Sequence, residues 1–180
     1  MKRVMVIGLG TFGSQLARQL YASGLEVVAI DKRKDVVQRI RDHSTKAVVA
    51  DATDREMLES IGIQPGDTVV ISFGEDLSAS TLLTLYLKEL KVAEIIVKVP
   101  NEDYQRILLK VGASEAIIPE REVANKLARK VLVSVPGKSP PVVGSSLSET
   151  AWPLALPMFL GRQNPGRPVM LSGSKPDFGQ

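Results

Sequence analysis

A glycine-rich turn directly after the first apolar segment constrains the fold of this chain more than any other feature. Residues 3–7 are followed by Gly8-Leu9-Gly10-Thr11-Phe12-Gly13, and an amphipathic stretch over 14–22 comes next. This order predicts a strand, a tight turn and a helix whose first N–H groups and dipole attract a pyrophosphate. Gly8 would permit the turn, Gly10 would let phosphates approach the backbone, and Gly13 would let the helix pack closely on the strand.

An acidic residue at the end of the second apolar segment supports nucleotide binding. Asp31 closes the segment 26–30, where a carboxylate accepts hydrogen bonds from the hydroxyls of an adenosine ribose. Its charge favours NAD over NADP, because a 2′-phosphate would meet it, although Lys32 and Arg33 offset part of that repulsion. The alternative is a unit of the same fold that binds no nucleotide.

Short apolar segments rich in valine and isoleucine alternate with helical segments along the first part of the chain. We expect strands at 4–7, 27–30, 47–50, 68–72, 95–99 and 116–118, and helices near 12–23, 34–42, 54–61, 77–90 and 102–111. Continuous hydrophobicity indicates parallel strands buried on both faces, and Thr53 with Glu56 suggests a capping box for the third helix. The alternation predicts an α/β fold of the Rossmann type, a doubly wound parallel sheet of six strands in the order 3-2-1-4-5-6.

On this pattern the chain divides into three parts. Residues 1–118 form the nucleotide-binding domain. A further helix at 119–133 has no strand left to return to, so we expect it to cross to a neighbouring subunit as a dimer-crossover helix. Residues 134–180 are rich in proline, glycine and serine and show no period, which predicts an irregular or disordered tail.

The carboxyl ends of the parallel strands form the expected binding crevice. The candidate cofactor-binding residues there are Gly8, Gly10, Thr11, Phe12, Gly13, Asp31, Lys32, Asp51, Ala52, Ser72, Gly74 and Lys98. Asp51 has two interpretations: an acceptor for the adenine amino group, or an N-cap or Asx-turn that opens the third helix. Lys98 either reaches a phosphate or ribose or is a solvated strand end.

Composition excludes several other classes of function. The chain has no cysteine, which rules out disulfides, thiolate metal sites and cysteine nucleophiles. Its single histidine, His43, lies in a polar stretch that predicts a surface position. Basic and acidic residues nearly balance before residue 134, so no nucleic-acid partner is expected. No catalytic set can be assembled, and neither a leader nor a membrane span is apparent, which favours a cytoplasmic nucleotide sensor.

Six segments together resemble the N-terminal nucleotide-binding domain of RCK (regulator of potassium conductance) proteins of the Trk/Ktr potassium-uptake type. They are 6–13, 27–31, 50–63, 67–90, 95–99 and 108–128, and the resemblance extends over residues 1–132. It implies a cytoplasmic regulatory subunit at the inner face of the membrane, a homodimer that assembles into a higher, octameric ring. NAD or NADH, or alternatively ATP/ADP, would gate a partner membrane potassium translocator.

The resemblance also implies roles for individual residues. The three motif glycines would hold phosphates, Asp31 the ribose, Asp51 the adenine edge, and Lys98 part of the pocket. Glu120 matches a position near the dimer interface that takes part in binding a divalent cation; the alternative is an acid in the first turn of a helix.

Two features of the sequence depart from the family pattern, and one other function is an alternative to potassium regulation. Thr11 stands where some ATP-responsive relatives carry an arginine, and the proline-rich stretch after Leu132 replaces a second regulatory domain. That stretch is either the product of truncation or a frame change, or an unusual native tail. The rival function is an NAD-dependent oxidoreductase or redox sensor, which lacks an evident proton donor here. A channel fused to its pore is disfavoured, since the first strand follows Met1 almost at once.

Overall fold

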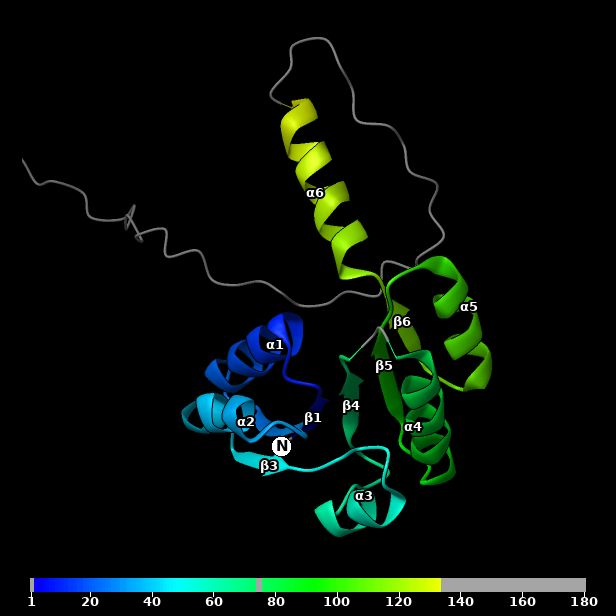
Figure 1. Ribbon diagram of the computed structural model, residues 1–180. Helices are drawn as coiled ribbons and strands as arrows, with labels where there is room; N and C mark the ends of the chain where they lie inside the picture. Colours follow the sequence, from blue (N-terminus) through cyan, green and yellow to red (C-terminus); the bar gives the residue numbers. More distant parts are fainter. Residues whose placement is uncertain (1, 74–75, 134–180) are drawn as a thin grey trace, which may run out of the picture. The chain divides into compact units, whose positions relative to one another are not determined.

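A parallel sheet of six strands forms the centre of the protein in a computed structural model that describes residues 2–73 and 76–133 (Figure 1). The strands are β1 (Arg3–Ile7), β2 (Glu26–Asp31), β3 (Lys46–Val49), β4 (Thr68–Ile71), β5 (Glu94–Lys98) and β6 (Glu115–Ile117). They lie in the order β3-β2-β1-β4-β5-β6, and every neighbouring pair is parallel. The expected topology is confirmed, with the reversal of strand order between β1 and β4.

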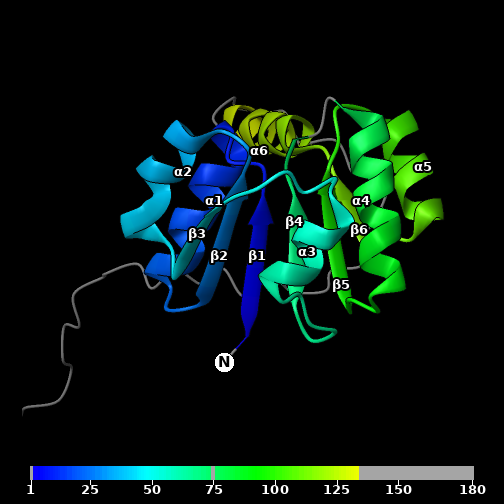
Figure 2. The same cartoon turned by 60° about the horizontal axis from the view of Figure 1, so that its bottom comes forward.

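Helices cover both faces of this sheet. They are α1 (Thr11–Ala22), α2 (Lys34–Ile40), α3 (Arg55–Ile61), α4 (Leu77–Glu89), α5 (Glu102–Val111) and α6 (Pro119–Val133), with a short 3-10 turn at Arg41–His43. Residues of α1 and α2 pack against one face, and residues of α3, α4 and α5 pack against the other (Figure 2). None of the helices in the described part has the length and hydrophobicity that a membrane span needs.

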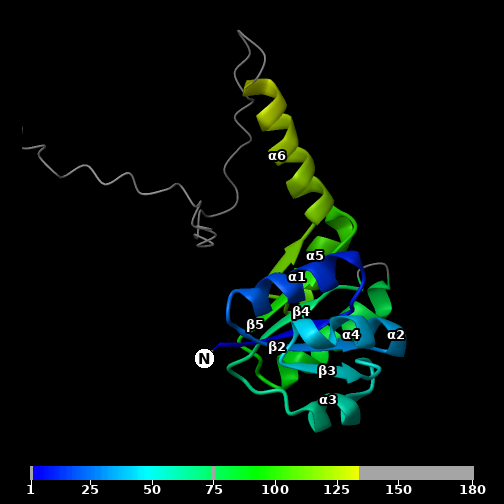
Figure 3. The same ribbon diagram turned by 90° about the vertical axis from the view of Figure 1, so that its left-hand side faces the viewer.

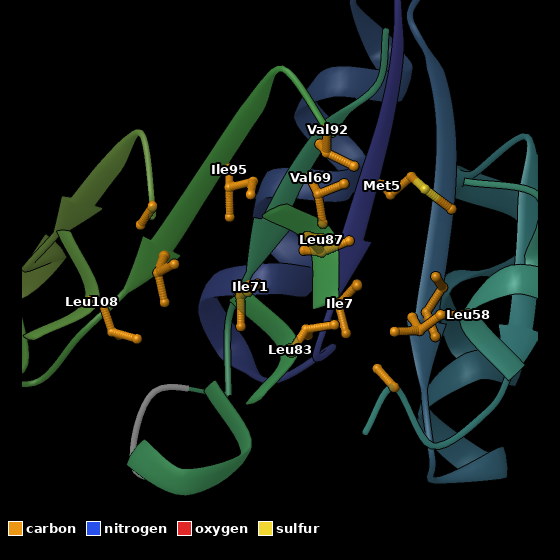
Figure 4. Close-up of a cluster of buried hydrophobic side chains, with 14 of the residues drawn as sticks. Met5, Ile7, Leu58, Val69, Ile71, Leu83, Leu87, Val92, Ile95 and Leu108 are labelled. Atoms are coloured by element: carbon orange, nitrogen blue, oxygen red, sulfur yellow. The ribbon is translucent and has the colours of Figure 1, made fainter. Parts of the chain in front are cut away.

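Alternation along β1 divides the core into two clusters. Met5 and Ile7 join Leu83 and Leu87 of α4 in the larger cluster, shown in Figure 4. Val4 and Val6 face the other way, into the cluster that includes Ala17 of α1. Because both faces are buried, β1 is fixed in position, and so is the glycine turn that follows it.

Two details differ from the sequence-based expectations, and one stays untested. The edge strand β3 is not buried on both faces, since it has one neighbouring strand and Val49 is 48% exposed. The expected capping box of α3 is wrong, because the N-cap is Asp54, whose Oδ1 accepts from the N–H groups of Glu56 and Met57 at 3.0 and 3.3 Å. The expected tail at 134–180 lies outside the described residues.

Helix α6 begins at Pro119 and extends away from the sheet after β6 (Figures 1 and 3). Its Val123, Leu127 and Val131 are 57%, 56% and 62% exposed. A spacing of four residues places these three side chains along one side of the helix. The apolar stripe of α6 is therefore left open to solvent.

Candidate nucleotide-binding site

The turn between β1 and α1 leaves the first N–H groups of the helix available to a ligand. Gly8 has a φ of +91°, and its N–H donates to the carbonyl of Ile30 at 2.8 Å, which holds the turn beside β2. Gly10 is the N-cap of α1 and has no side chain that could cap the helix. The N–H groups of the first turn thus point out of the sheet edge with the positive end of the helix dipole.

The glycines of this turn differ in the space around them. A Cβ on Gly10 would meet no atom within 4 Å. A Cβ on Gly13 would overlap the carbonyl oxygen of Gly8 and lie 2.9 Å from Ser72 Oγ. Gly13 is therefore required by packing of the helix on the turn, whereas the space at Gly10 is open to a bound group. The close packing at Gly13 agrees with the motif, and phosphate binding at Gly10 stays a prediction.

Asp31 ties the end of β2 to the glycine turn. Its side chain is 9% exposed; Oδ2 accepts from the N–H of Leu9 at 2.7 Å, and Oδ1 accepts from the N–H of Arg33 at 2.9 Å. Burial by itself raises the pKa of Asp31, but these two hydrogen bonds and the Arg33 guanidinium, whose Nε lies 3.3 Å from Oδ1, hold its pKa below the ordinary value. The carboxylate is ionised at neutral pH, and Oδ2 keeps a lone pair for a ribose hydroxyl.

One cavity of about 620 Å³ gathers most of the predicted site, a size typical of a small-molecule pocket. The predicted residues that line it are Gly8, Gly10, Asp31, Lys32, Asp51, Ala52, Ser72 and Lys98. Thr11 lies instead at a neighbouring cavity, and Gly13 is buried under the turn. Gly74 lies outside the described residues.

The two interpretations of Asp51 are partly resolved. Its Oδ1 accepts from the N–H of Thr53 at 2.9 Å and from the Thr53 hydroxyl at 2.7 Å, which is an Asx-turn. These hydrogen bonds lower the pKa of Asp51. The N-cap of α3 is the next acid, Asp54. Asp51 lines the cavity, and its role toward adenine stays a prediction.

Lys98 connects the pocket to α6. Its Nζ lies 3.0 Å from Oε1 of Glu120 and 6.0 Å from the ring centre of Phe12, with 24% of its side chain exposed. Lys98 is thus not a solvated strand end, because the ammonium is held between a carboxylate and an aromatic face. The hydrogen bond from Lys98 lowers the pKa of Glu120.

Two further polar groups of the pocket are notable, the predicted Ser72 and the unpredicted Asp76. Ser72 Oγ is buried without a hydrogen-bond partner among the described residues, at the wall of the cavity and next to Gly13. Asp76, which the sequence analysis missed, also lines the cavity and caps α4 by accepting from the N–H of Ala79 at 2.9 Å. An acid directly before the predicted helix at 77 is a signal that could have identified it.

The predicted metal ligand and the single histidine belong to no cluster of metal-binding side chains in the described residues. The part of the chain that the structure describes holds no group of three or more His, Asp or Glu side chains placed to bind a metal ion. Glu120 alone therefore stays a predicted cation ligand. His43 is exposed in the 3-10 turn, away from the cavity lining, as expected.

Comparisons with known proteins identify the family of this chain. Residues 4–119 match the family model of the TrkA-N domain. Ktr system potassium uptake protein C of Bacillus subtilis is 38% identical over 131 residues, which cover 73% of this chain and 59% of that protein. The chain therefore spans less than two thirds of the length of this relative.

Solved structures share the fold. The NAD(P)-binding domain of an exopolyphosphatase-related protein from Archaeoglobus fulgidus is 25% identical, with a TM-score of 0.63 over 73% of this chain and 98% of that one. The GsuK channel bound to NAD has a TM-score of 0.62 at 17% identity, over 71% of this chain and 23% of that one. With its glycine turn between β1 and α1, the buried acid at the end of β2 and the match over residues 4–119, the chain belongs to the TrkA-N domain family.

Proposed function

We propose that this chain is a cytoplasmic regulatory subunit of a potassium uptake system, in which NAD(H) or ATP/ADP binding gates a membrane potassium translocator. The observation that carries the proposal is the cavity at the reversal of strand order, with open space at Gly10 and a buried carboxylate at Asp31. Similarity to a Ktr potassium uptake protein supports the assignment to potassium transport.

The chemistry of the cavity favours binding over turnover. Its three acids, Asp31, Asp51 and Asp76, each accept hydrogen bonds from backbone N–H groups. In Asp31 and Asp51 these bonds hold the pKa below its ordinary value, which opposes a role as proton donor. The cavity lining contains no histidine, cysteine or tyrosine among the described residues. In an NAD-dependent oxidoreductase or redox sensor, the proton that accompanies hydride transfer would have to come from a lysine of the lining such as Lys98, which is paired with Glu120. This pairing favours the regulatory function over the rival one.

Thr11 bears on which nucleotide binds. It stands at the first position of α1, where a hydroxyl offers a hydrogen bond to a phosphate but no positive charge. A terminal phosphate of ATP forms a weaker hydrogen bond with this hydroxyl than it would with a guanidinium. This favours NAD(H) as the ligand over ATP, in line with the NAD-bound GsuK channel that shares the fold.

The ion pair between Lys98 and Glu120 connects the nucleotide pocket to α6, so ligand binding at Lys98 can affect how subunits assemble. A ligand phosphate or ribose that takes up the Lys98 ammonium competes with Glu120, which belongs to the first turn of α6. Release of Glu120 leaves a carboxylate for a divalent cation or for a neighbouring subunit. A ligand that acts through this ion pair shifts gating only to the extent that its affinity differs between two arrangements of the subunits, one with Lys98 paired to Glu120 and one with the pair broken.

We expect the Asp31→Asn variant to bind NAD roughly tenfold or more weakly than the unchanged protein. A hydrogen bond to a charged acceptor contributes about 1.5–3 kcal/mol, and the amide keeps an oxygen for the N–H of Leu9. Calorimetric titration with NAD, NADH, ATP and ADP measures this, together with an assay that shows no turnover. Asp103→Asn is the matched control, because Asp103 is an exposed acid in the first turn of α5. Submillimolar binding that survives in Asp31→Asn would contradict the site.

We also propose that the chain forms a homodimer through α6 and that dimers assemble into a ring. The exposed stripe of Val123, Leu127 and Val131 supports this, since burying it against a second copy removes apolar surface from water. Leu127→Asp is expected to convert the dimer to a monomer in sedimentation or light-scattering measurements. Asn125→Asp, on the opposite side of the same helix, adds the same charge and should leave the dimer intact. A monomeric unchanged protein would contradict the assignment.

A further inference from the structure

Helix α2 and the short segments beside it carry a basic surface. Residues 32–46 contain six basic and two acidic side chains, which gives this segment a net charge of +4 at neutral pH. Each of these eight residues is exposed. We call the basic ones the α2 surface; they are Lys32, Arg33, Lys34, Arg39, Arg41 and Lys46. Lys32 and Arg33 also line the nucleotide cavity, whereas the other four do not.

Most of the positive charge of the α2 surface is not neutralised within the chain. Arg33 lies 3.3 Å from Asp31, and Arg39 pairs with Asp35 at 3.0 Å. The side chains of Lys34, Arg41 and Lys46 form no ion pair within residues 2–73 and 76–133. The pair of Arg39 with Asp35 is exposed, and exposed pairs contribute little to stability. These cations are therefore available to an anionic partner.

The opposite face of the sheet carries the opposite charge. Residues 47–118 contain six basic and twelve acidic side chains, which gives a net charge of −6. This segment supplies α3, α4 and α5, which cover one face of the sheet, while α2 packs with α1 against the other (Figure 2). A domain with its charge separated in this way is oriented by the field of a charged surface. The α2 surface would turn toward an anionic partner and α3–α5 away from it.

The composition of the α2 surface favours lipid headgroups over other anionic partners. The core of a protein interface is enriched in aromatic and apolar side chains. In α2, however, Val36, Val37 and Ile40 are all buried, and none of the exposed large apolar side chains of the described residues lies in 32–46. The segment also has no aromatic ring to stack on nucleic-acid bases. An anionic membrane attracts lysine and arginine without needing either kind of contact.

We propose that the α2 surface binds the anionic headgroups of a lipid bilayer directly. This goes beyond the function proposed above, in which the translocator alone holds the chain at the membrane. It does not depend on the nucleotide site, because Lys34, Arg41 and Lys46 do not line that cavity. Contact through α2 would place the acidic α3–α5 face away from the bilayer.

Cosedimentation of the full chain with lipid vesicles tests this proposal. We expect binding to vesicles of phosphatidylcholine that contain phosphatidylglycerol, no binding to phosphatidylcholine alone, and loss of binding at high ionic strength. The double variant Lys34→Glu/Arg41→Glu is expected to bind the anionic vesicles at least tenfold more weakly, since it replaces two attractive charges by two repulsive ones. Its affinity for NAD should stay within twofold of the unchanged protein.

Arg106→Glu/Lys110→Glu is the matched control for this variant. Both residues are exposed on α5, and the change in net charge is the same. The control should keep its binding to anionic vesicles within threefold. Thermal unfolding of both double variants shows that the domain stays folded.

The outcomes separate the α2 surface from net charge, from another partner and from the nucleotide site. If the unchanged protein does not bind anionic vesicles, the proposal is overturned. It is also overturned if the α5 control loses as much binding as the α2 variant, because net charge then explains the attraction. Binding of a DNA duplex through Lys34 and Arg41 without binding of vesicles would likewise overturn it in favour of a nucleic acid. Titration with NAD in the same experiments reports on the proposed nucleotide site separately.

Discussion

Replacing Gly13 by alanine is expected to lower the free energy of unfolding of the domain by about 3 kcal/mol, at the upper end of the usual cost of overpacking. In most helices the same change stabilises, because glycine costs roughly 1 kcal/mol relative to alanine. Here the added methyl group would overlap the carbonyl oxygen of Gly8 and press on Ser72 Oγ. Backbone atoms cannot move aside as the end of a side chain does, so α1 must shift away from β1 and β4.

Urea unfolding, followed by circular dichroism, measures this difference. Gly66→Ala is the matched control, since a Cβ on Gly66 meets no atom within 4 Å and its φ is not in the left-handed region. The control should unfold within about 0.5 kcal/mol of the unchanged protein, as substitutions away from special positions usually do. A Gly13→Ala variant as stable as the control would mean that α1 does not pack on the turn as described.

The sheet order and the glycine turn could be predicted because their signals are local. Six short apolar segments alternate with helical ones, and parallel strands joined by right-handed crossovers leave few topologies. The structure bears out the motif in the positive φ of Gly8 and in the close packing at Gly13, while the role of Gly10 toward phosphates stays a prediction. The carboxyl-end rule then brought eight of the twelve predicted residues to one cavity.

Contacts between distant elements could not be predicted in the same way. Nothing near Lys98 in the chain indicates that its ammonium lies between Phe12 and Glu120, because three elements must pack before these groups meet. The exposure of β3 likewise follows from its place at the sheet edge, while its own sequence resembles that of a buried strand. Helical periodicity puts Arg18 and Arg39 on surfaces, but only the packing of α1 beside α2 brings them to one cavity.

Gly10→Ala is expected to leave the protein folded and to remove nucleotide binding. A Cβ there has open space, and the backbone at φ −66° and ψ −168° is extended, which alanine adopts without strain. The stability should lie within about 1 kcal/mol of the unchanged protein, since alanine caps a helix less well than glycine but restricts the unfolded chain.

The loss of binding in Gly10→Ala is expected because the added methyl group blocks the ligand and not because the fold changes. The methyl group would occupy the space through which phosphates reach the first N–H groups of α1, and each hydrogen bond to a charged oxygen contributes about 1.5–3 kcal/mol. We expect NAD and ADP to bind roughly 100-fold more weakly, which corresponds to about 2.7 kcal/mol. Calorimetric titration beside Gly66→Ala measures it. The two variants therefore separate two effects: Gly13→Ala is expected to lower the stability of the domain, and Gly10→Ala is expected to lower its affinity for nucleotides. Unchanged affinity in Gly10→Ala would mean that the phosphates bind elsewhere and would contradict the site.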